Sequence, residues 1–417
     1  MPPRVVVIID RLSTTAGGEA TLVDYVVAFA ANAARVHVVV GRSSIFQRLA
    51  LRLTLRRRAG LRSLPSVHPA SRVIDFRVAP SVYLSDFLTH DSARRATALR
   101  FLLDPRRNLV KRAFRRTDLI LMSQSLTDSG IRQLRSLTKL SASLILNHNG
   151  EPADFFAKWQ NKSKLEGQTA LDAYTSYLKN FDSVLFQSLS QELRFRALYP
   201  NLPVDTGVIW PSLDEEACRS AKRRDNPFVA ADLNLLCVAK FQSGKHQREL
   251  IEAFIEVAPE FPHVQLTFVG GESSERGYLE SCVEVAQEAG MLDRIRFVGP
   301  RPDALAFIAH CNLLILPSSS EGVSRAVREG AFFAKPILCT RLPGLESFLG
   351  KDGALYLRNS SISAISRGLR RALSNPAGWG EVAEAAKNSY TEKSSWETFE
   401  KQVGRMIRIQ LRQTGHS

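Results

Sequence analysis

Residues 312–329 read NLLILPSSSEGVSRAVRE, and no other part of the chain says more about its fold. Its apolar opening is typical of a buried strand in a parallel sheet. The serines that follow predict a turn, and the residues from Gly322 onward predict the start of a helix. A helix N-terminus binds anions, whereas carboxylates accept hydrogen bonds from hydroxyl groups. Glu321 and Glu329 beside such a terminus therefore indicate a ligand with phosphates and many hydroxyls, as in a nucleotide-sugar.

The strand, the Pro-Ser turn and the Glu-x7-Glu spacing together resemble the signature of retaining glycosyltransferase family 4, the glycosyl transferases group 1. This resemblance is dense from Leu235 to Leu349 and thin elsewhere. It implies the GT-B fold, which has two Rossmann-like doubly wound α/β domains facing each other across a cleft. The other segments that resemble the family are Val238–Lys245 (VAKFQSGK), Phe297–Arg301 (FVGPR), Lys335–Thr340 (KPILCT), Pro343–Glu346 (PGLE) and Ala16–Glu19 (AGGE).

Apolar strands alternate with helical segments, and this pattern by itself favours two doubly wound α/β domains. The expected strands are Arg4–Ile9, Val36–Val40, Leu119–Met122, Leu144–Asn147, Val184–Gln187, Leu235–Ala239, Gln265–Val269, Ile295–Val298, Leu313–Leu316, Ile337–Cys339 and Ala354–Leu357. The expected helices of the second half are Gln247–Val257, Tyr278–Ala289, Ala304–Ala309 and Ala326–Phe333.

The domain boundaries follow from composition and from the resemblance. We expect a basic acceptor-binding domain at residues 1–212 and a polar linker at 213–233, which contains an Asn-Pro pair. A nucleotide-sugar-binding domain is expected at 234–390. Residues 391–417 resemble the family's last helix, which crosses back to the first domain. A simple C-terminal amphipathic helix is the alternative.

Two lysines follow the first strand of the second domain. Lys240 and Lys245 would neutralise a leaving diphosphate, on which charge develops as the glycosidic bond breaks. The resemblance implies this role, since the family uses two basic residues at this spacing. The alternative is a pair of solvated surface lysines.

The resemblance also assigns roles to the paired carboxylates. It implies that Glu321 accepts hydrogen bonds from the donor sugar and that Glu329 holds the ribose hydroxyls. The backbone amides of Gly322, Val323 and Ser324 would face the phosphate or the sugar. The alternative is an ordinary surface helix that happens to carry two glutamates.

Three more candidate segments are less specific. Gly17 and Gly18 either let the backbone approach the donor phosphate or the acceptor, or form an ordinary strand–helix turn. His148 follows a strand where the family has a histidine that contacts the donor sugar, and a structural cap is the alternative. Arg301 follows the Gly-Pro turn at which the family reads the base, largely through its backbone.

Four residues depart from the family pattern. Lys240 stands where Arg is usual, so the charge is kept without the planar guanidinium. His246 and Ala334 stand where the family has glycine, and Arg328 stands where it is usually apolar. We expect the departures at Arg328 and Ala334 to affect the packing of the helix more than the ligand contacts.

We expect no cofactor and no metal ion, because the sequence has no metal triad and no Asp-x-Asp motif. The resemblance implies transfer with retention of the anomeric configuration. No residue is an obvious nucleophile, so we favour a same-face displacement in which the departing phosphate helps take the acceptor proton. A covalent enzyme intermediate stays open.

The positive charge lies in the first half of the chain. Residues 1–210 hold 30 Lys and Arg against 16 Asp and Glu, which is +14 of the net +15. The arginine-rich segment Arg42–Arg62 has helical apolar spacing, and it predicts contact with an anionic membrane surface. A solvated helix face is the alternative. Nucleic acid is not expected as a partner, because aromatic residues are scarce in the basic stretches and no binding motif is present.

The five cysteines form no C-x-x-C pair, which favours a reducing cytoplasmic compartment. No apolar run reaches the roughly 20 residues that a membrane helix needs. We therefore expect a glycosyltransferase on the inner face of the membrane. Its acceptor would be a glycan or a lipid-linked glycan in surface polysaccharide synthesis, such as that of lipopolysaccharide. A non-catalytic scaffold, a nucleic-acid-binding protein and a nucleotide-sugar hydrolase or epimerase are the competing hypotheses.

Overall fold

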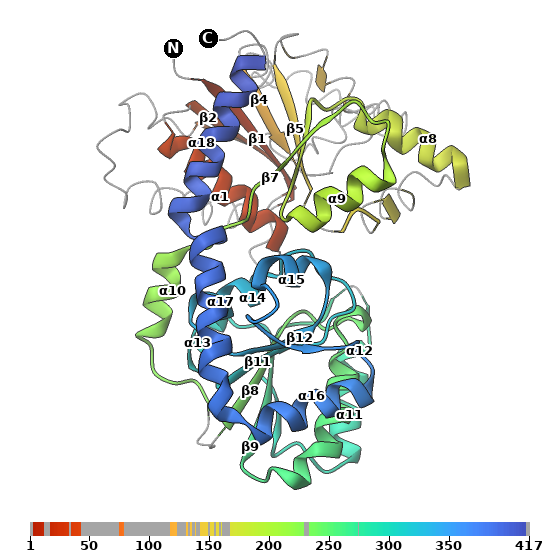
Figure 1. The fold of residues 1–417 in the computed structure, drawn as a ribbon, viewed down its shortest axis with the longest axis vertical. Coiled ribbons are helices and arrows are strands. Elements are labelled where there is room, and N and C mark those ends of the chain that lie inside the picture. Colours follow the sequence, from red (N-terminus) through yellow and green to blue (C-terminus); the bar gives the residue numbers. More distant parts are fainter. Residues whose placement is uncertain are drawn as a thin grey trace. The chain divides into compact units, whose positions relative to one another are not determined.

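The chain forms two compact units in the computed structural model (Figure 1). Unit 1 comprises Met1–Pro211 and Phe399–Ser417, and unit 2 comprises Ser212–Thr398. The residues that the structure describes are 3–11, 17–32, 35–42, 75–78, 117–122, 131, 134–135, 138, 142–148, 151–153, 156–157, 160, 167–228, 233–273 and 275–413.

Unit 1 is built on a parallel sheet with strand order β3-β2-β1-β4-β5-β6-β7. Its strands are β1 (Arg4–Arg11), β2 (Arg35–Arg42), β3 (Asp75–Val78), β4 (Leu119–Met122), β5 (Ser143–His148), β6 (Ser183–Phe186) and β7 (Asp205–Val208). All residues of β4, β5 and β6 are buried, as in a parallel sheet that is covered on both faces.

Helices α1 (Gly17–Ala31), α8 (Gly167–Leu178) and α9 (Leu189–Leu198) also belong to unit 1. The last helix, α18 (Trp396–Gln413), packs on this unit from Phe399 onward. The Phe399 ring lies 5.1 Å from that of Tyr25 in α1. Near the other end of α18, the buried Gln410 side chain donates to the Ser183 hydroxyl at 2.8 Å.

Unit 2 contains a second parallel sheet, with strand order β10-β9-β8-β11-β12-β13. Its strands are β8 (Leu233–Val238), β9 (Val264–Val269), β10 (Ile295–Phe297), β11 (Leu313–Leu316), β12 (Ile337–Thr340) and β13 (Leu355–Leu357). Its helices are α10 (Glu215–Lys222), α11 (Gln247–Val257), α12 (Tyr278–Glu288), α13 (Ala304–His310), α14 (Arg325–Phe332), α15 (Pro343–Leu349), α16 (Ile362–Ser374) and α17 (Trp379–Ser394).

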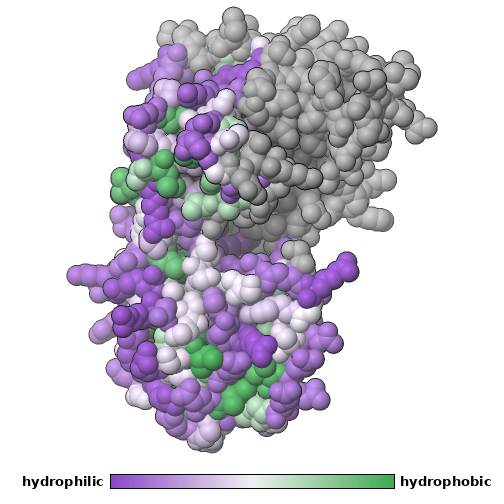
Figure 2. All heavy atoms as spheres, turned by 90° about the vertical axis from the view of Figure 1, so that its right-hand side faces the viewer, coloured by the Kyte–Doolittle hydropathy of each residue, from purple (hydrophilic) through white to green (hydrophobic). Residues whose placement is uncertain are grey.

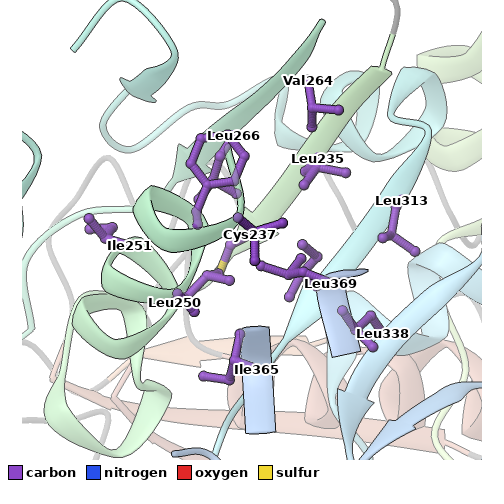
Figure 3. Packing of buried hydrophobic residues seen from close by; sticks show 14 of the residues in the cluster. Leu235, Cys237, Leu250, Ile251, Val264, Leu266, Leu313, Leu338, Ile365 and Leu369 are labelled. Atoms are coloured by element: carbon purple, nitrogen blue, oxygen red, sulfur yellow. The ribbon is translucent and has the colours of Figure 1, made fainter. Parts of the chain in front are cut away.

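Helices cover both faces of the unit 2 sheet. Helix α11 packs between α12 and α16, while α14 packs between α13 and α17. Figure 3 shows Leu250 of α11 and Ile365 and Leu369 of α16 pointing toward Leu235 and Cys237 of β8. These side chains are at most 1% exposed. The side of unit 2 seen below the grey atoms in Figure 2 is mainly hydrophilic, with a group of hydrophobic side chains near its lower end.

Most of the predicted elements agree with the structure within one or two residues. Helix α11 and strands β4 and β11 agree residue for residue. Strand β3 was not predicted. Its sequence Asp-Phe-Arg-Val alternates polar and apolar residues over only four positions, and the strand pairs in parallel with β2. The arginine-rich segment 43–62 lies outside the described residues.

The expected linker at 213–233 contains helix α10. Asp214 caps this helix by accepting from the Ala217 amide at 3.1 Å, and the acidic first turn suits the helix dipole. Cys218 and Ala221 are buried, because α10 packs on α13. The segment therefore belongs to unit 2, which continues beyond residue 390 to Thr398.

Two of the departures from the family pattern occupy left-handed backbone positions. Among the described non-glycine residues, only His246 (φ 55°) and Ala334 (φ 52°) have positive φ. Ala334 follows α14, where the amide of Lys335 donates to the Gly330 carbonyl and that of Ala334 to Ala331. This is a Schellman cap, a position that favours glycine because a Cβ is strained there.

We expect Ala334→Gly to stabilise the protein by about 1 kcal/mol, because it removes the steric cost of a left-handed alanine. Ala334 is exposed, so the change removes little packing. Urea unfolding measures the effect. Gly290→Ala is the matched reverse change, since Gly290 holds the same cap position after α12 with φ 64° and open space around its Cβ. It should lower stability by a similar amount. An Ala334→Gly variant no more stable than the wild type would contradict the left-handed cap.

Candidate active site

The order of the unit 2 sheet reverses at β8 and β11. The chain runs outward from β8 through β9 to β10, and then returns to place β11 on the other side of β8. Because β8 and β11 are parallel, with Leu235 opposite Leu313, the loops that follow them leave the same edge of the sheet. In open α/β sheets this reversal is where ligands bind.

An ion pair joins the two loops. The Lys245 ammonium lies 2.5 Å from Oε1 of Glu321, and the Ser318 hydroxyl donates to the same oxygen at 2.8 Å. The side chains of Lys245 and Glu321 are 21% and 12% exposed. The pair is thus partly screened from water yet accessible to a ligand. Both residues were predicted from sequence, and the structure brings them together.

The backbones of the two loops are also joined. The amide and the hydroxyl of Ser319 donate to the Gly244 carbonyl at 3.0 and 3.3 Å. The buried Gln247 side chain donates to the Lys240 carbonyl at 2.9 Å. These contacts fix the turn between Lys240 and Lys245. The Lys240 side chain is exposed and has no ion-pair partner within the described part of the chain.

Helix α14 begins beside this ion pair. Its N-cap residue, Ser324, makes no side-chain capping bond, so its hydroxyl does not occupy the helix terminus. Within the described ranges, the amides of Gly322, Val323 and Ser324 donate to no backbone carbonyl. One turn further on, Nε of Arg325 donates to Oε1 of Glu329 at 2.7 Å. The helix therefore offers amides at its start and a partly neutralised carboxylate within its second turn.

Gly344 packs against the backbone of the loop that carries Glu321. A Cβ built on this residue would lie 2.3 Å from the Gly322 carbonyl oxygen and 2.9 Å from that of Glu321. Only glycine fits so close to another backbone, because real Cβ atoms do not approach oxygen this closely. Helix α15, which begins at Pro343, is thereby packed directly against the loop that carries Glu321.

The predicted base-reading turn lies after β10. Gly299 has φ 75°, and its carbonyl accepts from the Gly270 amide at 3.0 Å. The exposed Arg301 guanidinium binds both carboxylate oxygens of Asp303, at 2.8 and 2.9 Å. This hydrogen bonding holds the pKa of Asp303 below its usual range. The Arg301 side chain is engaged by a neighbour, as expected if the turn acts through its backbone.

The remaining candidates lie in unit 1. Gly17 and Gly18 form the first turn of α1, and residues 12–16 before them lie outside the described residues. His148 ends β5 and is completely buried. Its ring lies 5.2 Å from that of Phe186 and 6.2 Å from that of Phe195. This environment favours the structural alternative for His148, and its proposed contact with a sugar stays a prediction.

Sequence reasoning missed the residues that hold the site together. Gln247, Ser318, Arg325 and Gly344 contact the predicted residues or their backbones. The Pro-Ser turn was a usable signal for Ser318, and the i,i+4 spacing was one for the pairing of Arg325 with Glu329. No local signal marks Gln247 or Gly344 as contacts of distant loops.

Across the described residues, His, Cys, Asp and Glu side chains nowhere gather in a group of three that could hold a metal ion. No helix in that part of the chain has both the length and the apolar character needed to cross a bilayer.

The fold is of the GT-B type. Residues 232–375 match the family model described as glycosyl transferases group 1, which confirms the resemblance inferred from sequence. Over 224 residues the chain is 23% identical to a glycogen synthase of Mycobacterium tuberculosis, covering 53% of this chain and 52% of that enzyme. Over 179 residues it is 27% identical to a D-inositol 3-phosphate glycosyltransferase of Corynebacterium urealyticum, covering 41% and 42%. The chain thus spans about half the length of the curated relatives it matches.

Solved structures resemble the whole chain. HepE of Anabaena, solved in complex with UDP, is 16% identical with a TM-score of 0.71 and covers 98% of this chain and 100% of that one. Sucrose-phosphate synthase from Thermosynechococcus elongatus is 16% identical with a TM-score of 0.68, covering 99% and 100%. The predicted fold class, two parallel-sheet α/β domains of GT-B type, is confirmed.

We expect Gly344→Ala to destabilise the protein by about 1–3 kcal/mol, because the new methyl group must displace the backbone of the Glu321 loop. Urea unfolding measures this loss. Gly380→Ala is the matched control, since Gly380 is also helical and a Cβ there would meet nothing within 4 Å. That control should be neutral or slightly stabilising. Equal stability of the two variants would contradict the close contact at Gly344.

Proposed function

We propose that the protein is a retaining glycosyltransferase that moves a sugar from a nucleotide-sugar to a glycan or lipid-linked acceptor. The observation that carries this proposal is the Lys245–Glu321 pair, 2.5 Å long, at the reversal point of the unit 2 sheet. A cation for the diphosphate and a carboxylate for the sugar hydroxyls stand there beside the start of α14. Glu329 would hold the ribose, and Lys240 would supply the second positive charge.

The proposed reaction breaks the bond between the anomeric carbon and the phosphate oxygen. Negative charge then grows on the departing diphosphate, where Lys240, Lys245 and the amides of 322–324 would stabilise it. The acceptor hydroxyl forms the new bond on the same face of the sugar, and its proton passes to the departing phosphate. The residues described around the donor site supply the needed positive charge themselves, so we propose that no metal ion is required.

A nucleoside-diphosphate-sugar as the donor is supported by the ligands of one structural neighbour, since HepE was solved with UDP and with UDP-glucose. A non-catalytic scaffold would bind the nucleotide-sugar at the same site but would not transfer the sugar. The two hypotheses therefore separate on catalysis and not on binding. Unit 1, which carries most of the positive charge, is proposed to receive the acceptor.

We expect one nucleoside diphosphate in a panel of nucleotides to raise the melting temperature of the wild type, and to do so equally in the presence of EDTA. Glu329→Ala should lose most of this stabilisation, because the ribose hydroxyls lose their carboxylate. Glu284→Ala, a change at an exposed glutamate of α12, is the matched control and should respond like the wild type. A protein that responds to no nucleotide or nucleotide-sugar would rule out the proposal.

Turnover then decides between enzyme and scaffold. The stabilising nucleotide-sugar should be consumed in the presence of acceptor, with the same anomer in donor and product by NMR. Binding without release of the nucleoside diphosphate would favour the scaffold.

We also propose that the basic first half holds the protein at an anionic membrane surface in surface polysaccharide synthesis. Residues 1–210 carry +14 of the net charge, and each Arg near such a surface contributes about 1 kcal/mol. The protein should sediment with vesicles that contain phosphatidylglycerol and be released as salt rises. Neutral phosphatidylcholine vesicles are the control. Binding that ignores lipid charge and salt would contradict this proposal.

A further inference from the structure

The donor helix α14 contains a buried positive charge that the proposed chemistry does not use. Arg328 precedes Glu329 and is only 3% exposed. Its Nη1 donates to the Ser212 carbonyl at 2.6 Å. Burying a guanidinium is costly unless its hydrogen bonds are satisfied, so this contact is a strong constraint on both partners.

Ser212 has a special place in the chain. It is the first residue of unit 2, directly after Pro211, where the chain leaves unit 1 for the first time. It is itself 1% exposed. Arg328 therefore ties the helix that carries Glu329 to the first covalent connection between the units.

The second connection is tied to the same place. The Glu215 carboxylate, three residues after Ser212, accepts from the Trp396 amide at 2.8 Å and from the Tyr390 hydroxyl at 3.1 Å. Trp396 begins α18, which returns to unit 1 at Phe399. Glu215 thus joins the two connections through its carboxylate.

The C-terminal end of helix α14 also contacts the residues around Glu215. The ring of Phe332, its last residue, lies 5.4 Å from that of Tyr390 in an edge-on arrangement. The ammonium of Lys387 in α17 donates to the Phe332 carbonyl at 2.7 Å. Glu329 of α14 also lies near the Cys218 thiol of α10. Burial raises the pKa of this thiol, and the negative charge of Glu329 raises it further.

We propose that Arg328 is a positioning residue that anchors both connections to helix α14, directly through Ser212 and, by way of the nearby Glu215, through Trp396. Binding at Glu329 and the conformation of the two connections would then be coupled. The anchoring stands on the contacts alone, whereas the coupling to a nucleotide rests on the proposed function.

Hydrogen–deuterium exchange of the full chain tests the anchor without any ligand. Arg328→Met removes the donor and keeps the apolar volume, while Arg328→Lys keeps a charge and one donor group. In Arg328→Met we expect amide exchange in residues 212–222 and 395–398 to accelerate about tenfold, the effect of losing one charged hydrogen bond. Arg328→Lys should fall between Arg328→Met and the wild type. Arg371→Met is the matched control, since Arg371 also donates from a helix to a backbone carbonyl, that of Tyr356.

UDP is the probe for the coupling. In the wild type it should protect residues 321–329 and also 212–222, whereas in Arg328→Met it should protect 321–329 alone. Turnover should fall in Arg328→Met with little change in the KM for the donor, and Arg328→Lys should restore part of it. Unchanged ligand-free exchange in both Arg328 variants would overturn the anchor. Protection of 321–329 without 212–222 in the wild type would overturn the coupling. If UDP protects nothing, the proposed function fails for uridine nucleotides, and the ligand-free comparison still decides the anchor.

Discussion

The parallel pairing of β8 with β11 is the constraint on which the candidate site depends. It starts two loops from one edge of the sheet, and so brings Lys245 to 2.5 Å from Glu321 across 76 positions of sequence. Two glycines keep these loops in place, because backbone passes too close for any Cβ. One is Gly344, beside the Glu321 loop, and the other is Gly270, whose Cβ would lie 1.8 Å from the Ala239 carbonyl oxygen.

The chain departs from its family at positions where the departure has a local cost, and neighbouring contacts offset it. His246 holds a left-handed conformation between Lys245 and α11, and its Nδ1 lies 2.9 Å from Oε1 of Glu249. Ala334 keeps both hydrogen bonds of the cap that glycine would favour. Arg328 buries its charge but finds the Ser212 carbonyl. The contact between Lys245 and Glu321 is present beside all three of these residues.

The fold is shared with solved structures at low sequence identity for a physical reason. A parallel sheet covered on both faces needs only apolar strands, and many sequences satisfy that need, so the fold matches solved structures at 16% identity. A site for phosphates and hydroxyls needs particular charges at particular loop positions. The family match lies at residues 232–375, which contain the loops after β8 and β11.

Local sequence patterns were enough to predict most of the elements and to select the candidate site residues. Strand β11, helix α11 and the Glu321–Glu329 spacing are local patterns of hydrophobicity and turn chemistry, and these need no knowledge of distant residues. Which of these residues contact one another follows from the packing of distant segments. In the folded chain Lys245 pairs with Glu321, and Gly344 packs against the Glu321 loop. Arg328 is buried against Ser212, and the expected linker contains helix α10. Each of these outcomes depends on packing between segments far apart in sequence, and such packing leaves no periodic trace in either segment alone.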